Sequence, residues 1–225
     1  MTDEPKPQRF VERHLDPASR LGEILFGLIM VLSFTLTAGL TVADGTAGVR
    51  QLLFAALGCN VAWGIIDAAM YVMNCLTERV EKAHVIWAIR DAPDERAALD
   101  VVRAEIEPRL ETLTGPENRE SLCRSILAYL AHAEVPPTGV TKEDLYGALA
   151  CFWLVFVSCL PAALPFLVFS EPTRALRVSN LLLIGMLFLV GQEWGRYART
   201  NRVVAGLVMM SIGLALVGIA VALGG

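Results

Sequence analysis

Long stretches almost free of charged side chains constrain the fold of this chain more than any other feature. Three of them lie in the first 170 residues. Each is close to the length of about 20 apolar helical residues that crosses a bilayer core about 30 Å thick. Two more follow towards the C-terminus. These five candidate spans are residues 24–42, 52–75, 148–170, 178–190 and 203–225.

The fourth stretch is the shortest. It crosses a membrane only if Gly191, Gln192 and Glu193 lie at the interface or inside the helix bundle. The third stretch contains Pro161 and Pro165. Because proline lacks a backbone donor, we expect these two residues to break or kink the third helix.

A charged segment separates the second stretch from the third. We expect the second span to continue as a helix past Glu78 and Glu81 until Asp91-Ala92-Pro93 stops it, because the residue before a proline disfavours helical geometry. Apolar residues at helical spacing predict two more helices, which completes a three-helix insert. These two helices are expected over residues 94–113 and 117–132.

Two local patterns mark the starts of membrane helices. Asp16-Pro17 is an N-cap residue followed by a proline at the first helical position, which predicts the start of the first helix. The sequence Thr141-Lys142-Glu143-Asp144 resembles a capping box and is expected to open the third span.

Lysine and arginine in short loops predict the orientation, because they concentrate on the cytosolic side. Four of them lie in the N-terminal segment, and Arg196, Arg199 and Arg202 lie between the last two stretches. The N-terminus is therefore expected in the cytosol, although Arg174 and Arg177 then fall outside. The N-terminal segment lacks the features of a cleaved signal peptide, which suits a bacterial inner membrane.

Together these features predict an all-α, multi-pass integral membrane protein with about five transmembrane helices and a three-helix cytosolic insert between spans 2 and 3. The expected parts are a cytosolic N-terminal segment (residues 1–20), transmembrane helices 1 and 2 (21–76), the insert (77–143) and transmembrane helices 3 to 5 (144–225).

Composition argues against several classes of function. The net charge is −4, and no basic, aromatic-interleaved stripe predicts a nucleic-acid partner. Five scattered cysteines without a C-x-x-C pair favour reduced, packed thiols over a redox or metal role. The chain has no H-E-x-x-H, P-loop or G-x-G-x-x-G pattern and no Ser-His-Asp candidate. We therefore predict that it is not an enzyme and holds no tightly bound cofactor.

Asp67 is the strongest functional candidate, because an ionisable group deep in a span costs at least about 2.5–3.5 kcal/mol. Asn60, Asp67 and Asn74 recur every seven residues, and Met70 is expected on the same helix face. Glu23, in the first span, is expected near Asn74. Carboxylate, amide and thioether groups together suit Fe²⁺ or Mn²⁺. The same spacing also serves interhelical hydrogen bonds, so simple packing is an alternative.

The insert carries a second group of candidate metal ligands. Glu78, Glu81 and His84 lie three residues apart near one face of the extended second helix, and further glutamates follow on the next two helices. Carboxylates on three helices can collect metal ions between them. A plain solvated face explains the same residues.

Over nearly the whole chain this layout resembles the vacuolar iron transporter family. That family has five spans, an inside N-terminus and a glutamate-rich helical metal-binding domain between spans two and three. The stretch Glu23-Ile24-Leu25-Phe26-Gly27 is similar to the family's entry into its first span, and the segment from Gly191 to Gly224 is similar to its last two spans. A bacterial subgroup looks most similar.

The liganding residues depart from the family's pattern. The family has Asn-Asp-Gly in its first span, where this chain has Leu28-Ile29-Met30-Val31. Met70 matches the methionine of the family's Met-x-x-x-Glu motif, and Asn74 replaces the glutamate. We infer that Asp67, one turn before Met70, supplies the missing charge.

The leading hypothesis is a proton-coupled transporter that moves Fe²⁺ or Mn²⁺ out of the cytosol. The resemblance implies a homodimer and proton exchange. The insert residues would gather the metal, and Asp67, with Met70 and Asn74, would pass it across the bilayer. The alternative is a non-transporting membrane protein whose insert binds a protein partner.

Overall fold

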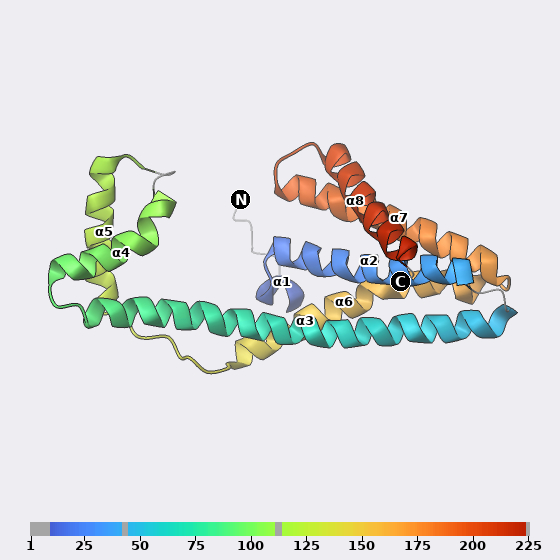
Figure 1. Cartoon of the computed structure of the whole chain (residues 1–225), viewed down its shortest axis with the longest axis horizontal. Helices are drawn as coiled ribbons and strands as arrows, with labels where there is room; N and C mark the ends of the chain where they lie inside the picture. The colour runs from blue at the N-terminus through green and yellow to red at the C-terminus, as the bar shows by residue number, and fades with distance from the viewer. Residues whose placement is uncertain (1–9, 42–44, 111–113, 224–225) are drawn as a thin grey trace, which may run out of the picture. The chain divides into compact units, whose positions relative to one another are not determined.

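A computed structural model describes residues 10–41, 45–110 and 114–223, which form eight α-helices and no β-strand (Figure 1). The chain divides into a first unit, Met1–Tyr71 with Lys142–Gly225, and a second unit, Val72–Thr141. The helices are α1 (Phe10–His14), α2 (Pro17–Thr41), α3 (Gly45–Arg90), α4 (Glu95–Leu110), α5 (Pro116–Leu130), α6 (Lys142–Val168), α7 (Pro172–Tyr197) and α8 (Arg202–Ala222).

Four of the described helices are long and apolar enough to cross a membrane, so the chain has the helices of an integral membrane protein. The candidate spans are Pro17–Thr35, Phe54–Arg90, Lys142–Val168 and Thr173–Tyr197. The fourth reaches sufficient length because α7 extends beyond both ends of its charge-free stretch. A fifth span stays a prediction, since the apolar stretch found in α8, Arg202–Leu216, is shorter.

The helix starts predicted from local sequence are confirmed. Asp16 caps α2, because its Oδ1 accepts hydrogen bonds from the backbone N–H groups of Ala18 (2.8 Å) and Ser19 (3.1 Å). The hydrogen bonds from Ser19 hold the pKa of the Asp16 carboxyl below its ordinary value. α6 begins at Lys142, within the sequence that resembles a capping box.

The prolines do not break the third predicted span, and a kink there stays a prediction. α6 continues from Lys142 to Val168 through both Pro161 and Pro165. A side-chain hydrogen bond joins this helix to its neighbour, because the buried Ser179 hydroxyl of α7 donates to the Ala162 carbonyl of α6 at 2.8 Å.

The core of the first unit lies between α2, α6 and α7. Its most buried members include Leu28 and Leu32 of α2, Cys159 of α6, and Leu183 and Leu187 of α7. Small residues allow the helices to approach closely, as is usual between membrane helices.

Two glycine contacts show how close this approach is. A Cβ added at Gly27 of α2 would overlap the Ser158 side chain and lie 2.8 Å from the Val155 carbonyl oxygen of α6. A Cβ added at Gly191 of α7 would lie 2.7 Å from the carbonyl oxygen of Ala205 and the Cα of Gly206 in α8. Figure 1 shows α7 and α8 side by side.

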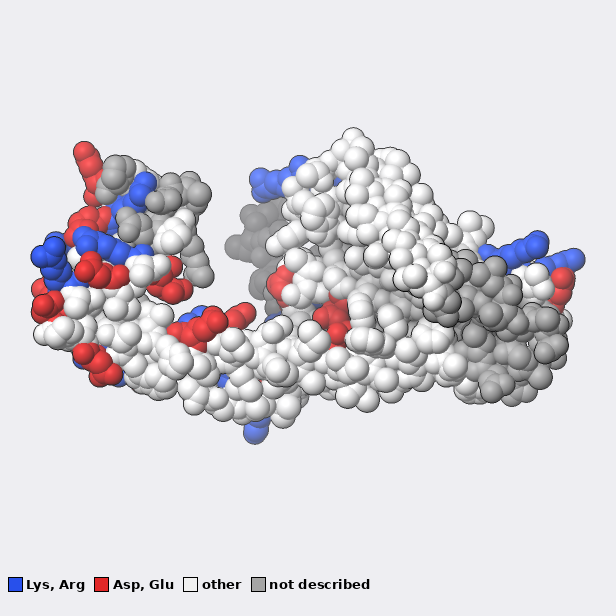
Figure 2. Space-filling view, viewed as in Figure 1, with Lys and Arg blue, Asp and Glu red and all other residues white. Residues whose placement is uncertain are grey.

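The second unit has its own small core, built by the end of α3 with α4 and α5. Ile89, Leu99, Val102, Cys123 and Leu127 are buried together there. The expected helices over residues 94–113 and 117–132 correspond to α4 and α5. Figure 2 shows mixed acidic and basic side chains over these two helices.

Arginines of the second unit fix its loops and join its helices. Arg79 donates to the Gly139 carbonyl at 2.7 Å, and Arg90 donates to the Ala133 carbonyl. Between α4 and α5, Arg103 is hydrogen-bonded to Glu120. The cytosolic location of this unit stays a prediction.

Candidate functional site

One face of α3 is buried within the first unit. Ala56 and Asn60 are fully or almost fully buried, and Gly64 faces Phe152 of α6. Further along, the Tyr71 hydroxyl donates to the His14 carbonyl at 3.3 Å. These positions follow one another every three to four residues, and Asp67 falls between Gly64 and Tyr71 on the same face.

Asp67 is hydrogen-bonded to Glu23 of α2, carboxyl to carboxyl. Two ionised carboxylates this close to each other repel, so a proton or a cation between them is favourable. The Oδ2 atom of Asp67 is buried and has no hydrogen-bond partner among the described residues. The Cys151 thiol of α6 is a further hydrogen-bond partner of Glu23. Three helices therefore meet at this carboxyl pair.

The register between α2 and α3 explains why Glu23 meets Asp67. Phe26 of α2 packs edge-on against Trp63 of α3, with ring centroids 5.5 Å apart. Phe26 lies three residues after Glu23 on α2, and Trp63 lies four residues before Asp67 on α3. The two helices therefore run antiparallel at this level. We expected Glu23 near Asn74, which is wrong by seven residues, or about two helical turns.

Asn60 lies two turns from Asp67 on the same face and is completely buried. Its amide nitrogen donates to the Ala56 carbonyl at 3.1 Å, while its Oδ1 atom has no partner among the described residues. A buried polar atom without a partner costs about 1–3 kcal/mol. Seven residues of helix span about 10 Å, so Asn60 and Asp67 do not ligate one ion together.

The structure separates the other predicted ligands from this pair. Met70 is 53% exposed and lies off the buried face of α3. Asn74, Glu78, Glu81 and His84 belong to the part of α3 in the second unit, and all are exposed.

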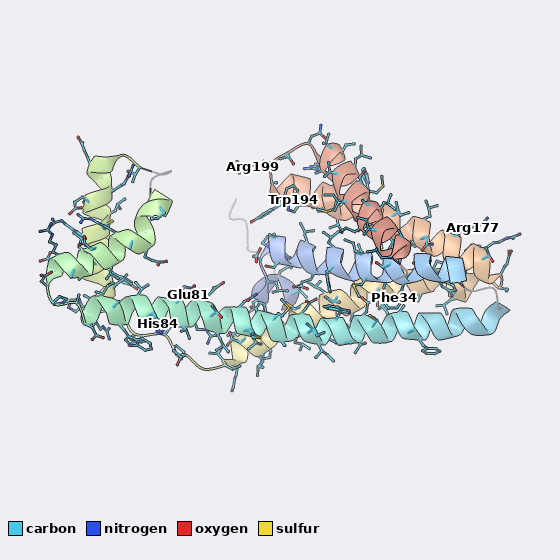
Figure 3. All side chains as sticks on the ribbon, viewed as in Figure 1. Phe34, Glu81, His84, Arg177, Trp194 and Arg199 are labelled. Carbon is cyan, nitrogen blue, oxygen red and sulfur yellow. The ribbon has the colours of Figure 1, made fainter. Side chains whose placement is uncertain are left out.

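Glu81 and His84 are labelled on α3 in Figure 3. The ring centroids of His84 and Trp87 lie 5.5 Å apart. Glu120, one of the further glutamates of the insert, is engaged by Arg103 and Arg124. Across the described ranges, no group of three or more His, Cys, Asp or Glu side chains is arranged to hold a metal ion.

Sequence reasoning missed the part played by Cys151. We interpreted the cysteines as packing thiols, and Cys151 is indeed buried beside Ala150 and Leu15. Its contact with Glu23 depends on how α6 docks against α2, which no spacing within either helix reveals.

Comparison with known proteins identifies no relative. The chain matches no protein-family model, and no curated protein is significantly similar to it.

Proposed function

We propose that this protein is a proton-coupled divalent-metal transporter that moves Fe²⁺ or Mn²⁺ out of the cytosol, with the Glu23–Asp67 pair as its membrane ion site. The observation that supports this proposal is the hydrogen-bonded pair of carboxyl groups between two apolar helices. Ionisable groups at membrane depth usually mark ion or proton pathways, because burying them without a function is costly.

Competition for the same oxygens couples the two ions. With one shared proton the pair carries a single negative charge. Loss of that proton leaves two carboxylates that repel each other, and a divalent cation relieves this repulsion. Metal entry and proton release are thus linked at one site. Two carboxylates with a nearby thiol suit Mn²⁺ or Fe²⁺, because these metals accept oxygen ligands and tolerate softer ones.

In this proposal the exposed Glu78, Glu81 and His84 of the second unit gather metal from the cytosol. Their charge and exposure suit a low-affinity collecting surface. The homodimer follows from the resemblance to vacuolar iron transporters, whereas the inside N-terminus and the fifth span rest on the distribution of lysine and arginine and on the apolar stretches. The buried Asn60 oxygen offers the next polar atom along α3 beyond the carboxyl pair.

Flux into proteoliposomes tests the proposal. Fe²⁺ and Mn²⁺ uptake is measured under an imposed pH gradient for the wild type, Asp67→Asn, Glu23→Gln and a matched control, Glu171→Gln. Glu171 is an exposed carboxylate of the same unit that pairs with Arg174 at 2.6 Å. Gradient-dependent flux should be lost in the first two variants and kept in the control. Wild-type flux in Asp67→Asn would contradict the proposal.

A second candidate is a non-transporting membrane protein whose second unit binds a protein partner. It is favoured by large apolar side chains exposed on that unit, among them Trp87, Leu122 and Tyr129, the last 74% exposed. Absence of flux for both metals, from folded protein, would support this candidate.

A further inference from the structure

A cavity of 910 Å³ opens among α1, α2, α6 and α7 in the first unit. Its walls are mainly apolar and include Leu21, Ile24, Trp153, Leu154 and Val157. The volume lies in the range of about 300–1,000 Å³ that encloses small ligands in proteins. Three of the four helices that form it are candidate membrane spans, so membrane lipids have access to this part of the protein.

Charged side chains form one part of the wall of this cavity. Arg20 lies 3.6 Å from Glu12, and Arg196 lies 3.4 Å from Glu193. The Nε atom of Arg20 is buried and has no hydrogen-bond partner among the described residues. A guanidinium group has five N–H donors, and these long ion pairs leave donors available for a ligand.

A second cavity, of 520 Å³, shares Glu12, Pro17 and Arg20 with the first. The remaining residues of its wall are mostly polar and include Arg13 and Asp16. Arg20 therefore stands where an apolar cavity adjoins a polar one. Such a pair of cavities matches an amphiphile, with a charged headgroup in one and a hydrocarbon chain in the other.

We propose that these two cavities bind one phospholipid with a primary ammonium in its headgroup, of the phosphatidylethanolamine class. The acyl chain lies along Leu21, Ile24 and Val157, and the phosphate is held by Arg20, because arginine suits phosphate geometry and charge. Trp153 and Tyr197 border the cavity, as aromatic residues do at the membrane interface.

The balance of charge around the cavities selects the headgroup. Each arginine of the larger cavity lies beside a glutamate, so a headgroup with both a negative and a positive group fits better than a purely anionic one. A primary ammonium donates hydrogen bonds to Glu12 or Glu193, whereas a choline headgroup has no N–H donor. This inference does not depend on the transport proposal.

Lipid-induced stabilisation tests this inference. Delipidated full-length protein in detergent is titrated with phosphatidylethanolamine, phosphatidylcholine or phosphatidylglycerol of identical acyl chains, and thermal unfolding is followed. Phosphatidylethanolamine should stabilise at the lowest concentration. Arg20→Gln should raise its half-saturating concentration about tenfold, as expected for loss of a charged hydrogen bond. The matched control is Arg177→Gln, an exposed arginine of α7 outside both cavities (Figure 3).

A second variant keeps the test decisive if Arg20→Gln does not fold. Val157→Trp fills the apolar cavity without touching the arginines, and it should abolish the selective stabilisation. Equal stabilisation by all three lipids would indicate annular lipid only and overturn the proposal. Preference for phosphatidylglycerol would overturn the headgroup assignment. Selective binding that appears only after deletion of residues 1–9 would show that the chain's own N-terminus occupies the cavities.

Discussion

The carboxyl group of Glu23 on α2 is hydrogen-bonded to that of Asp67 on α3, inside a bundle of apolar helices. The polar partners of Glu23 are Asp67 and the Cys151 thiol, and Asp67 has Glu23. The stability of the protein and the proposed transport therefore depend on the same pair of residues.

A double-mutant cycle measures this dependence. Glu23→Ala and Asp67→Ala should each destabilise the protein, and the double variant should lose less than the sum of the two. Residues in direct contact typically show interaction energies of about 0.5–3 kcal/mol. Unfolding in detergent provides the measurement. The control cycle pairs Glu23→Ala with Met70→Ala, an exposed residue off the buried face, and should be additive within about 0.5 kcal/mol. An additive Glu23–Asp67 cycle would show that the two side chains act independently.

The close approach of α2 to α6 at Gly27 predicts a local steric effect. Gly27→Ala should destabilise the protein by about 1–3 kcal/mol, because the added methyl group meets the Val155 carbonyl, a backbone atom that cannot rotate away. Gly22→Ala is the matched control, since no atom lies within 4 Å of its added Cβ. Thermal unfolding of the two variants distinguishes them. Equal melting temperatures would mean that α2 and α6 pack less closely than described.

Glu120 predicts a pH dependence of stability in the second unit. A hydrogen bond from Arg103, and a smaller contribution from a hydrogen bond with Arg124, hold the pKa of the Glu120 carboxyl below its ordinary value of 4.5. A lowered folded-state pKa stabilises the fold fully above pH 4.5, and this contribution disappears as the pH falls through the lowered value. Glu120→Gln should therefore lower the melting temperature slightly at pH 7, and the difference from wild type should vanish in acid.

The control for Glu120→Gln is Glu134→Gln, an exposed carboxylate in the same unit. It should leave the melting temperature unchanged at both pH values. If the effect of Glu120→Gln persisted in strong acid, its cause would be the shape of the side chain and not its charge.

The metal-gathering role of the second unit predicts a particular kinetic pattern. The double variant Glu78→Gln/Glu81→Gln should raise the apparent KM for Mn²⁺ flux several-fold and leave the maximal rate near wild type, because these residues raise the local metal concentration without joining the membrane site. Glu134→Gln serves again as the control. An unchanged KM would assign Glu78 and Glu81 to an ordinary solvated face.

Local sequence was sufficient for features that depend on a few neighbouring residues. The cap at Asp16, the start of α6 at Lys142 and the end of α3 before Pro93 were all predicted, because each depends on hydrogen bonds or backbone sterics within one turn. The depth of Asp67 in an apolar helix was likewise apparent from the sequence.

Features that depend on how helices dock were predicted less well. Met70 and Tyr71, three and four residues after Asp67, lie to either side of the line along α3 that passes through Asp67. Spacing alone therefore did not show which of the two points into the protein. Likewise, a row of polar residues on each of two helices leaves their relative shift along the axis undetermined. Glu23 was therefore assigned to Asn74, two turns from its partner in the structure.

The glycine contact between α7 and α8 bears on how such a protein can move. At Gly191 and Gly206 the two helices lie so close that a side chain added at either position would push them apart, and a shift of one helix along the other is sterically opposed. α3, in contrast, meets its neighbours through side chains such as Trp63 and Tyr71, which can change rotamer. In the proposed transport cycle, a tilt of the first-unit part of α3, which carries Asp67, would therefore meet less steric resistance than a shift between α7 and α8.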